Sequence, residues 1–452
     1  MRSRQFSADE LLQRARYRRA VEAVIWGMPV VNFDLMLQAF LKAGGLPNQV
    51  PFWSHLLDGQ NQTLTPNPDT IYFNPFFDTK DGPVVVEIPA AEGGSITGSI
   101  DDCWQNALED VGLAGADKGA GGKYLILPPG HVGTTPDGYI AVPSDTFQSY
   151  AILRSNVKSG SEADVAQAVA YGKRIRVYPL AQAARPPETR HLDMAGVLYD
   201  STIPYDRDFF RSLARIVEKE PWLTRDKAMI DPLRTLGICK GEPFDPGRAL
   251  EETFDAAAQE AHAYLDMRYE AVFDPPFAPG TRWALPAVPE VVEGMPNFFA
   301  STEAYPIDGR AVSYSLAYFS AKHLGEGQYY LMAIRDAAGD ALDGSETYRL
   351  RVPANAPVTL YWSATVYDRE THALIRNVAR ASRASTSPGI VAEPDGSVDL
   401  WFSPHVPAGK EANWIPTVPG RGFEVLFRLY GPKKPFFEKQ WVLPDLVKDQ
   451  LP

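Results

Sequence analysis

The densest group of side chains that could do chemistry lies in the segment TPNPDTIYFNP. Asn67, Asp69, Thr70 and Tyr72 fall close together there, where two prolines stiffen a turn at the start of a strand. Such residues can simply form an Asx-type turn. The alternative is a site, and we predict one in which Asp69 and Tyr72 act as acid/base groups while Asn67 and Thr70 bind the ligand.

A second group follows in SIDDCWQNALED and in the glycine-rich stretch GADKGAGGKY. Asp101 lies near Trp104, and an apolar ring beside a carboxyl group can raise its pKa, as a general acid requires. Asp117 and Lys118 come next, and a lysine can stabilise an oxyanion. We therefore hypothesise that Asp101 and Lys118 are catalytic and that Trp104 and Asp117 contact the ligand.

Motifs for nucleotides and metals are missing from the sequence. GADKGAGGKY has neither the Walker spacing nor GxGxxG, so a wide loop before the strand KYLILPP explains its glycines better. The seven histidines form no HxH or HExxH pair, and Cys103 and Cys239 form no CxxC pair. We expect no cofactor and no local metal site. A metal site would need histidines and carboxylates from distant segments.

The elements that must position these residues follow from the hydrophobic pattern. A helix is predicted over 8–45, with Ser7 and Glu10 as a capping box and Val21, Val24, Ile25 and Met28 on one face. Short strands bounded by Pro, Gly or Asp fill 63–156, helical patterns return over 161–275, and strands fill 300–435. The breaker-rich stretch 275–296 reads as a linker or as a strap over a surface.

We therefore predict a mainly β chain with helical segments, in which two antiparallel β-sandwich domains are joined by helices. The predicted parts are an N-terminal helix (1–45), a first β domain (46–160), a helical region with linker (161–299) and a second β domain (300–452).

The second β domain shows the clearest alternation of apolar and polar residues. In PVTLYWSATVY the residues Val358, Leu360 and Trp362 share one predicted face. The strands SVDLWFS and FEVLFRLY alternate in the same way, and Arg428 and Tyr430 lie on the opposite, polar face of the last strand. This polar, ring-bearing face is either a ligand platform or a surface covered by another subunit or by residues 275–296.

Charge and composition exclude several classes of partner. The net charge is −12 and no Lys/Arg-rich run occurs, so we expect neither nucleic acid nor an anionic membrane as a partner. No stretch approaches about 20 apolar residues and no secretory signal is recognisable, which predicts a soluble, cytoplasmic protein without a membrane span.

Several motifs resemble two bacterial families. TPNPDTIY and DKGAGGKYLILPPG are similar to the domain-of-unknown-function family numbered 1254. LYWSATVYDRETHALI, DGSVDLWFSP, NWIPTVPG and FRLYGP are similar to the family numbered 1214. The resemblance implies two jelly-roll-like β sandwiches joined by helices, a homo-oligomer, and motif positions that include Trp414, Arg428 and Tyr430 as ligand contacts. It implies no particular activity.

We expect a cleft formed mainly by the first β domain, closed by aromatic groups near the linker or the second domain. It would bind a small polar organic or carbohydrate-like ligand and catalyse acid/base hydrolysis or elimination. Two alternatives stay open: a non-catalytic oligomeric scaffold, and a metal-dependent enzyme with scattered His and carboxylate ligands.

Overall fold

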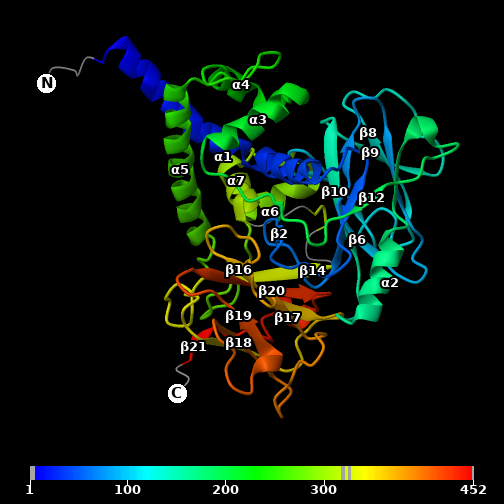
Figure 1. Cartoon of the computed structure of the whole chain (residues 1–452), viewed down its shortest axis with the longest axis vertical. Coiled ribbons are helices and arrows are strands. Elements are labelled where there is room, and N and C mark those ends of the chain that lie inside the picture. The colour runs from blue at the N-terminus through cyan, green and yellow to red at the C-terminus, as the bar shows by residue number, and fades with distance from the viewer. Residues whose placement is uncertain (1–5, 317–320, 324–326, 450–452) are drawn as a thin grey trace.

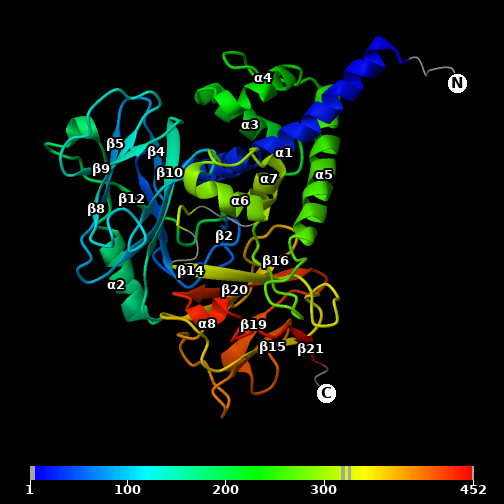
Figure 2. The same cartoon turned by 180° about the vertical axis from the view of Figure 1, so that it is seen from behind.

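The computed structural model describes residues 6–316, 321–323 and 327–449. Helices take 28% of the chain and strands 24%, in several separate sheets, so the chain is mixed α and β rather than mainly β. Figure 1 shows three parts: a group of helices, a first β unit beside it, and a second β unit against both. The view from behind shows the same arrangement (Figure 2).

The helices occur mainly in the N-terminal segment and in the middle of the chain. The α-helices are α1 (Ala8–Lys42), α2 (Glu162–Gly172), α3 (Arg207–Lys219), α4 (Lys227–Arg234), α5 (Arg248–Ala271), α6 (Pro289–Gly294), α7 (Ile307–Leu316) and α8 (Lys434–Phe437). The 3-10 helices are η1 (Leu180–Gln182), η2 (Thr224–Asp226), η3 (Met295–Asn297) and η4 (Glu411–Asn413).

Helix α1 begins as predicted, because Ser7 and Glu10 form a complete capping box. Before Ala23 only Ala20 is buried, but from Ala23 to Asp34 every residue is buried. The sequence prediction missed this mostly apolar part: by length and composition alone, α1 could cross a membrane. In the structure 83% of that apolar stretch is buried inside the protein, as in a core helix.

The first β unit contains a seven-stranded and a four-stranded sheet. The larger sheet has the order β12-β1-β3-β10-β6-β7, with β4 also paired to β10. Its strands are β1 (Val50–Phe52), β3 (Ile71–Phe73), β4 (Phe76–Asp78), β6 (Ile96–Asp102), β7 (Ala107–Val111), β10 (Gln148–Ser155) and β12 (His191–Asp193). The smaller sheet is made of β11 (Arg176–Pro179), β5 (Val84–Ile88), β8 (Gly122–Leu127) and β9 (Tyr139–Pro143). A parallel pair joins β2 (Asn61–Gln62) to β13 (Tyr199–Asp200).

Strands that follow residue 160 complete this unit. β11 pairs with β5, and β12 pairs with β1, so the segment predicted as a helical region also supplies sheet edges. α2 packs on β10 and β3. One hydrophobic cluster contains residues of both sheets, among them Phe73 and Leu153 of the larger and Val86 and Ile126 of the smaller.

The second β unit contains two four-stranded sheets. The first has the order β14-β20-β16-β17, from β14 (Gln328–Ala333), β20 (Phe423–Tyr430), β16 (Trp362–Asp368) and β17 (Ser382–Ala384). The other has the order β19-β18-β15-β21, from β19 (Trp414–Pro416), β18 (Val398–Ser403), β15 (Tyr348–Val352) and β21 (Val447–Lys448).

The predicted alternation holds for most of these strands. Trp362 is buried in the unit's apolar cluster, which also contains Leu400 and Phe427. Leu360 was assigned to the same face, and this is wrong: its side chain is 68% exposed. The reason is that β16 begins only at Trp362, so the two-residue period has not yet started at Leu360.

The breaker-rich stretch packs over this unit as a strap. Ala284 forms a bridge with Met332 of β14, and Trp283 is buried and donates to the carbonyl of Pro444 at 2.9 Å. Farther along, this stretch forms α6 and η3.

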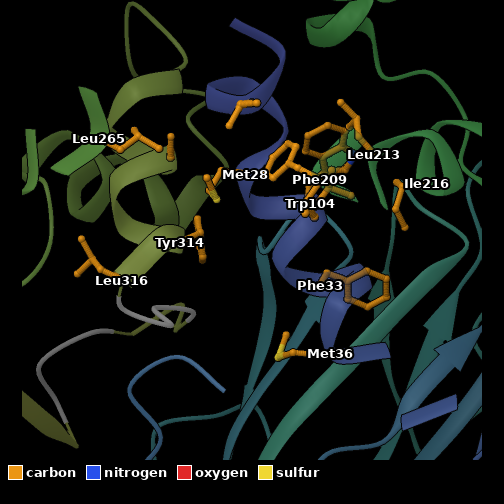
Figure 3. Packing of buried hydrophobic residues seen from close by; sticks show 14 of the residues in the cluster. Met28, Phe33, Met36, Trp104, Phe209, Leu213, Ile216, Leu265, Tyr314 and Leu316 are labelled. Carbon is orange, nitrogen blue, oxygen red and sulfur yellow. The ribbon is translucent and has the colours of Figure 1, made fainter. Parts of the chain in front are cut away.

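The helices form a third layer that covers the outer faces of both β units. Their apolar cluster includes Phe33 of α1, Tyr150 and Ile152 of β10, and Tyr367 and Leu426 of the second unit. Figure 3 shows part of this cluster, with Phe209 and Leu213 of α3 beside Trp104; it also labels Met28, Phe33, Met36, Ile216, Leu265, Tyr314 and Leu316. The seven-stranded sheet and the β14-β20-β16-β17 sheet both contribute residues to this cluster as well as to the cluster of their own unit. Polar side chains on these buried faces must find partners inside the protein.

Candidate binding cleft between the two β units

A cleft of about 980 Å³ lies where the two β units meet. The first unit lines it with residues of β6, β7, β10 and α2, and the second unit with the ends of β14 and β20 and the segment before β16. Such a volume is at the upper end of the range for small-molecule sites. Most of its lining residues belong to the first unit, and the second unit adds the aromatic side chains of Tyr361 and Tyr430.

The predicted turn 65–72 binds directly to the second β unit. The Asn67 side chain donates from Nδ2 to the phenol oxygen of Tyr430 at 2.5 Å. The backbone N–H of Asn67 donates to the phenol oxygen of Tyr72 at 3.0 Å, and the Asn67 Oδ1 accepts from the backbone of Asp69 at 3.0 Å. The segment 65–72 is thus an Asx turn and also the place where the first β unit contacts the second, which we call the junction. Its hydrogen bonds hold Tyr72 and Tyr430 close to each other.

Arg428 lies behind this turn and is almost fully buried, at 2% exposure. It donates to the carbonyl oxygen of Thr65 at 2.9 Å, to Thr365 Oγ1 at 2.9 Å and to the phenol oxygen of Tyr367 at 2.6 Å. The polar face of β16 and β20 is therefore covered by another segment of the same chain. Among the described residues, the strap 275–296 supplies none of the hydrogen-bond partners of Arg428.

Arg154 of β10 is a cation at the wall of the cleft, which Lys158 also lines. It is partly exposed, its Nε donates to the phenol oxygen of Tyr72 at 3.3 Å, and its guanidinium lies 5.3 Å from the centre of the Tyr72 ring. It lines the cleft and also a small internal cavity of about 40 Å³ that Tyr330 and Arg428 line as well. Among the described residues, no Asp or Glu forms an ion pair with Arg154 or Arg428.

Asp69 is the carboxyl group nearest to this cluster in the predicted site. Ser382 donates to its Oδ1 at 2.7 Å, while its Oδ2 is buried without a hydrogen-bond partner among the described residues. Burial raises the pKa of Asp69, and the positive charge of Arg428 partly opposes that shift. Asp69 is thus biased toward the protonated form, which suits a group that donates a proton.

Tyrosine rings complete the wall. The rings of Tyr361 and Tyr430 stack with their centres 4.3 Å apart, and both residues line the cleft. Burial raises the pKa of both phenols, so they stay protonated near neutral pH and can donate hydrogen bonds. Thr70 also lines the cleft, and its hydroxyl is 3.4 Å from the carbonyl of Ser155.

The cleft also contains a histidine and a carboxylate that the sequence prediction missed. His323 Nδ1 lies 2.9 Å from Asp110 Oδ2, and both residues line the cleft. The same carboxylate accepts from Ser99 Oγ at 2.9 Å and from the backbone N–H groups of Lys322 and His323 at 3.0 and 2.8 Å. With Nδ1 as the donor to Asp110, the other ring nitrogen of His323 is the basic one. No local sequence signal marks this pair, because 213 residues separate its members.

Asp101 and Trp104 line neither of these two cavities. Asp101 is fully buried on β6, opposite Tyr150 of β10. Trp104 packs on Trp26 with ring centres 4.8 Å apart, in the helical layer. The carboxyl group next to Trp104 is that of Asp102, whose Oδ1 accepts from the Trp104 backbone at 2.8 Å.

Asp117, Lys118 and Trp414 also lie outside these cavities. Asp117 organises the glycine-rich loop by accepting from the backbone of Gly112 at 2.8 Å and of Gly121 at 3.1 Å. Lys118 is exposed on this loop. Trp414 donates from its indole to the Ser403 carbonyl at 3.0 Å, within the second unit. These contacts explain the residue types at 117 and 414 through local structure.

Within the part of the chain that the structure describes, no group of three or more His, Cys, Asp or Glu side chains could hold a metal ion. The described cysteines Cys103 and Cys239 are free.

Comparison with known families matches the two β units separately. Residues 47–179 match the family described as a protein of unknown function (DUF1254), and residues 327–434 match the family described as a protein of unknown function (DUF1214). The two matches follow the order that the sequence motifs predict. The chain therefore carries a match to the DUF1254 family in its N-terminal part and a match to the DUF1214 family in its C-terminal part.

Two solved structures align with most of the chain. The VPA0106 protein of Vibrio parahaemolyticus is 17% identical, with a TM-score of 0.60 over 96% of this chain and 100% of that chain. An uncharacterised protein of Burkholderia cenocepacia is 11% identical, with a TM-score of 0.44 over 97% of this chain and 95% of that chain. The first similarity shows a shared fold. No curated protein matches the chain.

Proposed function

We propose that the cleft between the two β units binds a small polar organic ligand and that His323 moves a proton on it, as in hydrolysis or elimination. The observation that carries this proposal is the His323–Asp110 pair at the wall of a cleft of about 980 Å³. A carboxylate that fixes one imidazole nitrogen leaves the other to accept a proton from substrate or water.

The groups around this pair have the roles that acid/base chemistry needs. Tyr430 and Tyr361 offer phenol donors, and Arg154 offers a cation at the same cleft. Asp69 lines neither cavity, and Tyr72 lines only the small cavity of about 40 Å³. Both lie in the turn segment that contacts the second unit, and burial raises the pKa of Asp69. The proposal therefore keeps them as groups beside the cleft and adds His323 as the base within it.

We also propose that each β unit is a two-layer sandwich, with the cleft at the place where the two sandwiches meet. One apolar cluster per unit, drawing residues from both of its sheets, supports this description. A helical layer that packs on both sandwiches holds their facing edges in a fixed relative position. A cleft between these edges can therefore be preformed before the ligand binds.

The test compares turnover by the wild-type protein, by His323→Asn and by His405→Asn. A panel of small esters, hydroxy acids and glycosides is screened by NMR for any converted compound. Asparagine can still donate to Asp110 but lacks the second ring nitrogen, so we expect kcat to fall at least about 100-fold with little change in melting temperature. His405 is exposed on the second unit, and its substitution should leave kcat unchanged.

Full turnover by His323→Asn would refute the role of His323 as the base. The rival function is a non-catalytic oligomeric scaffold. That function would be favoured if no compound of the panel bound or reacted while light scattering showed a stable oligomer.

A further inference from the structure

Arg154 at the cleft wall has no anionic partner among the described residues, whereas other arginines of β strands and helices form ion pairs. Arg207 pairs with Glu251 at 2.8 Å, and Arg369 pairs with Asp266 at 2.5 Å. Arg154 has only the Tyr72 phenol as a hydrogen-bond partner among the described residues. A guanidinium group that loses water contacts and gains no ion pair with a carboxylate is unfavourable unless another negative charge compensates it.

A second uncompensated cation lies behind the first. The terminal nitrogens of Arg428 donate hydrogen bonds to the carbonyl oxygen of Thr65 and to the hydroxyl oxygens of Thr365 and Tyr367. All three acceptors are formally neutral. Its Nε is buried without a partner among the described residues. Both arginines line the small cavity of about 40 Å³. Two guanidinium groups without an ion pair among the described residues thus lie close together in a chain whose net charge is −12.

Asp110 and Asp164 also line the cleft, but their hydrogen bonds are with residues other than Arg154. Asp110 accepts from His323 and Ser99, and Asp164 accepts from Ser159. Asp69 is the carboxyl whose charge would act on Arg428, and burial biases it toward its neutral form. None of these groups forms an ion pair with Arg154 in the described part of the chain.

We infer that the ligand of this cleft is an organic anion whose carboxylate or phosphate oxygens bind the guanidinium of Arg154. This inference rests on the proposed function, because it names the ligand class of the same cleft. An arginine fork binds two such oxygens at once, and the phenols of Tyr430 and Tyr361 supply further donors beside it. Leu113 and Leu360, which are 81% and 68% exposed, also line the cleft and would contact an apolar body of the ligand.

The test measures binding of matched probes to the full chain by calorimetry. Benzoate is compared with benzamide, a pair of similar shape that differs mainly in charge, and phenyl phosphate is compared with phenol, which lacks the anionic phosphate group. We expect at least one anion to bind at least about 10-fold more tightly than its neutral partner, and Arg154→Met to remove that advantage. The preferred pair identifies carboxylate or phosphate as the recognised group.

Two further variants keep the test decisive. Arg174→Met removes an exposed arginine at the end of α2 that lines neither cavity, and it should bind like the wild type. Arg154→Lys keeps the charge but not the fork, so it should weaken anion binding with little effect on folding; it carries the test if Arg154→Met does not fold.

Equal binding of charged and neutral probes, unchanged by Arg154→Met, would overturn the anion inference and leave the binding cleft intact. No binding of any probe at millimolar concentration would also overturn the inference, while the turnover of His323→Asn still decides the proposed function. Anion binding through Arg154 without any turnover would support the inference and count against the catalytic role.

Discussion

At the scale of single residues, the buried carboxyl of Glu220 joins α3 to the loop before β10. Its two oxygens accept from the backbone N–H groups of Phe147 and Gln148 at 2.7 and 3.0 Å, and the residue is 3% exposed. Burial raises the pKa of Glu220 from 4.5 to about 7 against the effect of those hydrogen bonds. Between pH 4.5 and about pH 7, Glu220 is therefore mostly protonated in the folded protein and mostly ionised in the unfolded chain.

This shift predicts how stability depends on pH. Because the folded pKa lies above the unfolded value, the stabilisation is complete below about pH 4.5 and is lost as the pH rises to about 7. Relative to Glu220→Gln, the unfolding free energy of the wild type should fall by about 3 kcal/mol between pH 4.5 and pH 8, as urea titrations would measure. Exposed Glu188→Gln is the control and should follow the wild type. If the difference in unfolding free energy between the wild type and Glu220→Gln did not change with pH, the raised pKa of Glu220 would be contradicted.

At the scale of elements, the contact between β6 and β10 depends on a glycine. Gly98 pairs with Leu153, and a Cβ atom at this position would lie 1.8 Å from the carbonyl oxygen of Ile152. No side chain fits there unless the two central strands of the larger sheet move apart. Because both strands also line the cleft, their spacing sets the position of Arg154 relative to Ser99.

We therefore predict that Gly98→Ala lowers the unfolding free energy by about 3 kcal/mol, as chemical denaturation would measure. Gly247→Ala serves as the control, since a Cβ there meets nothing within 4 Å and the backbone is extended; we expect a loss of no more than about 1 kcal/mol. Equal stability of the two variants would show that β6 and β10 adapt without cost.

At the scale of the whole molecule, the three parts share their buried surfaces. The helical cluster contains Ile152 of the first unit and Leu426 of the second, and the segment before β3 donates from Thr65 to the carbonyl of His372 at 2.8 Å. The Gln62 side chain donates to the carbonyl of Leu374 at 2.7 Å. No part can unfold without exposing a face of another.

This sharing predicts one cooperative unfolding transition. Tryptophan fluorescence reports on Trp26 in the helical layer and on Trp362 in the second unit. The unfolding transition followed by this fluorescence should coincide with the loss of helix measured by circular dichroism. Arg428→Met should shift both curves together by about 3 kcal/mol, because it leaves buried carbonyls without a donor. The exposed Arg351→Met should shift neither by more than about 0.5 kcal/mol. Two separated transitions, with only one moved by Arg428→Met, would refute this view.

The sequence by itself determined the local structure of this protein. Ser7 and Glu10 predicted the start of α1, and the alternation in FEVLFRLY predicted β20 with Phe427 inward, because capping and the two-residue period act over a few neighbouring residues. The motifs also predicted the pairing of the two families. They placed Asn67 and Tyr72 in a turn before a strand, and the structure has that turn.

Only the tertiary structure decided what those residues meet. Nothing in the sequence near Asn67 indicates that its side chain contacts Tyr430, 363 residues farther along, or that Arg428 is covered by the carbonyl of Thr65. The pair of Asp110 and His323 arises in the same way. Periodicity fixes which way a side chain points from its own strand, whereas the partner on the other side depends on how the layers pack, and packing is a property of the whole chain.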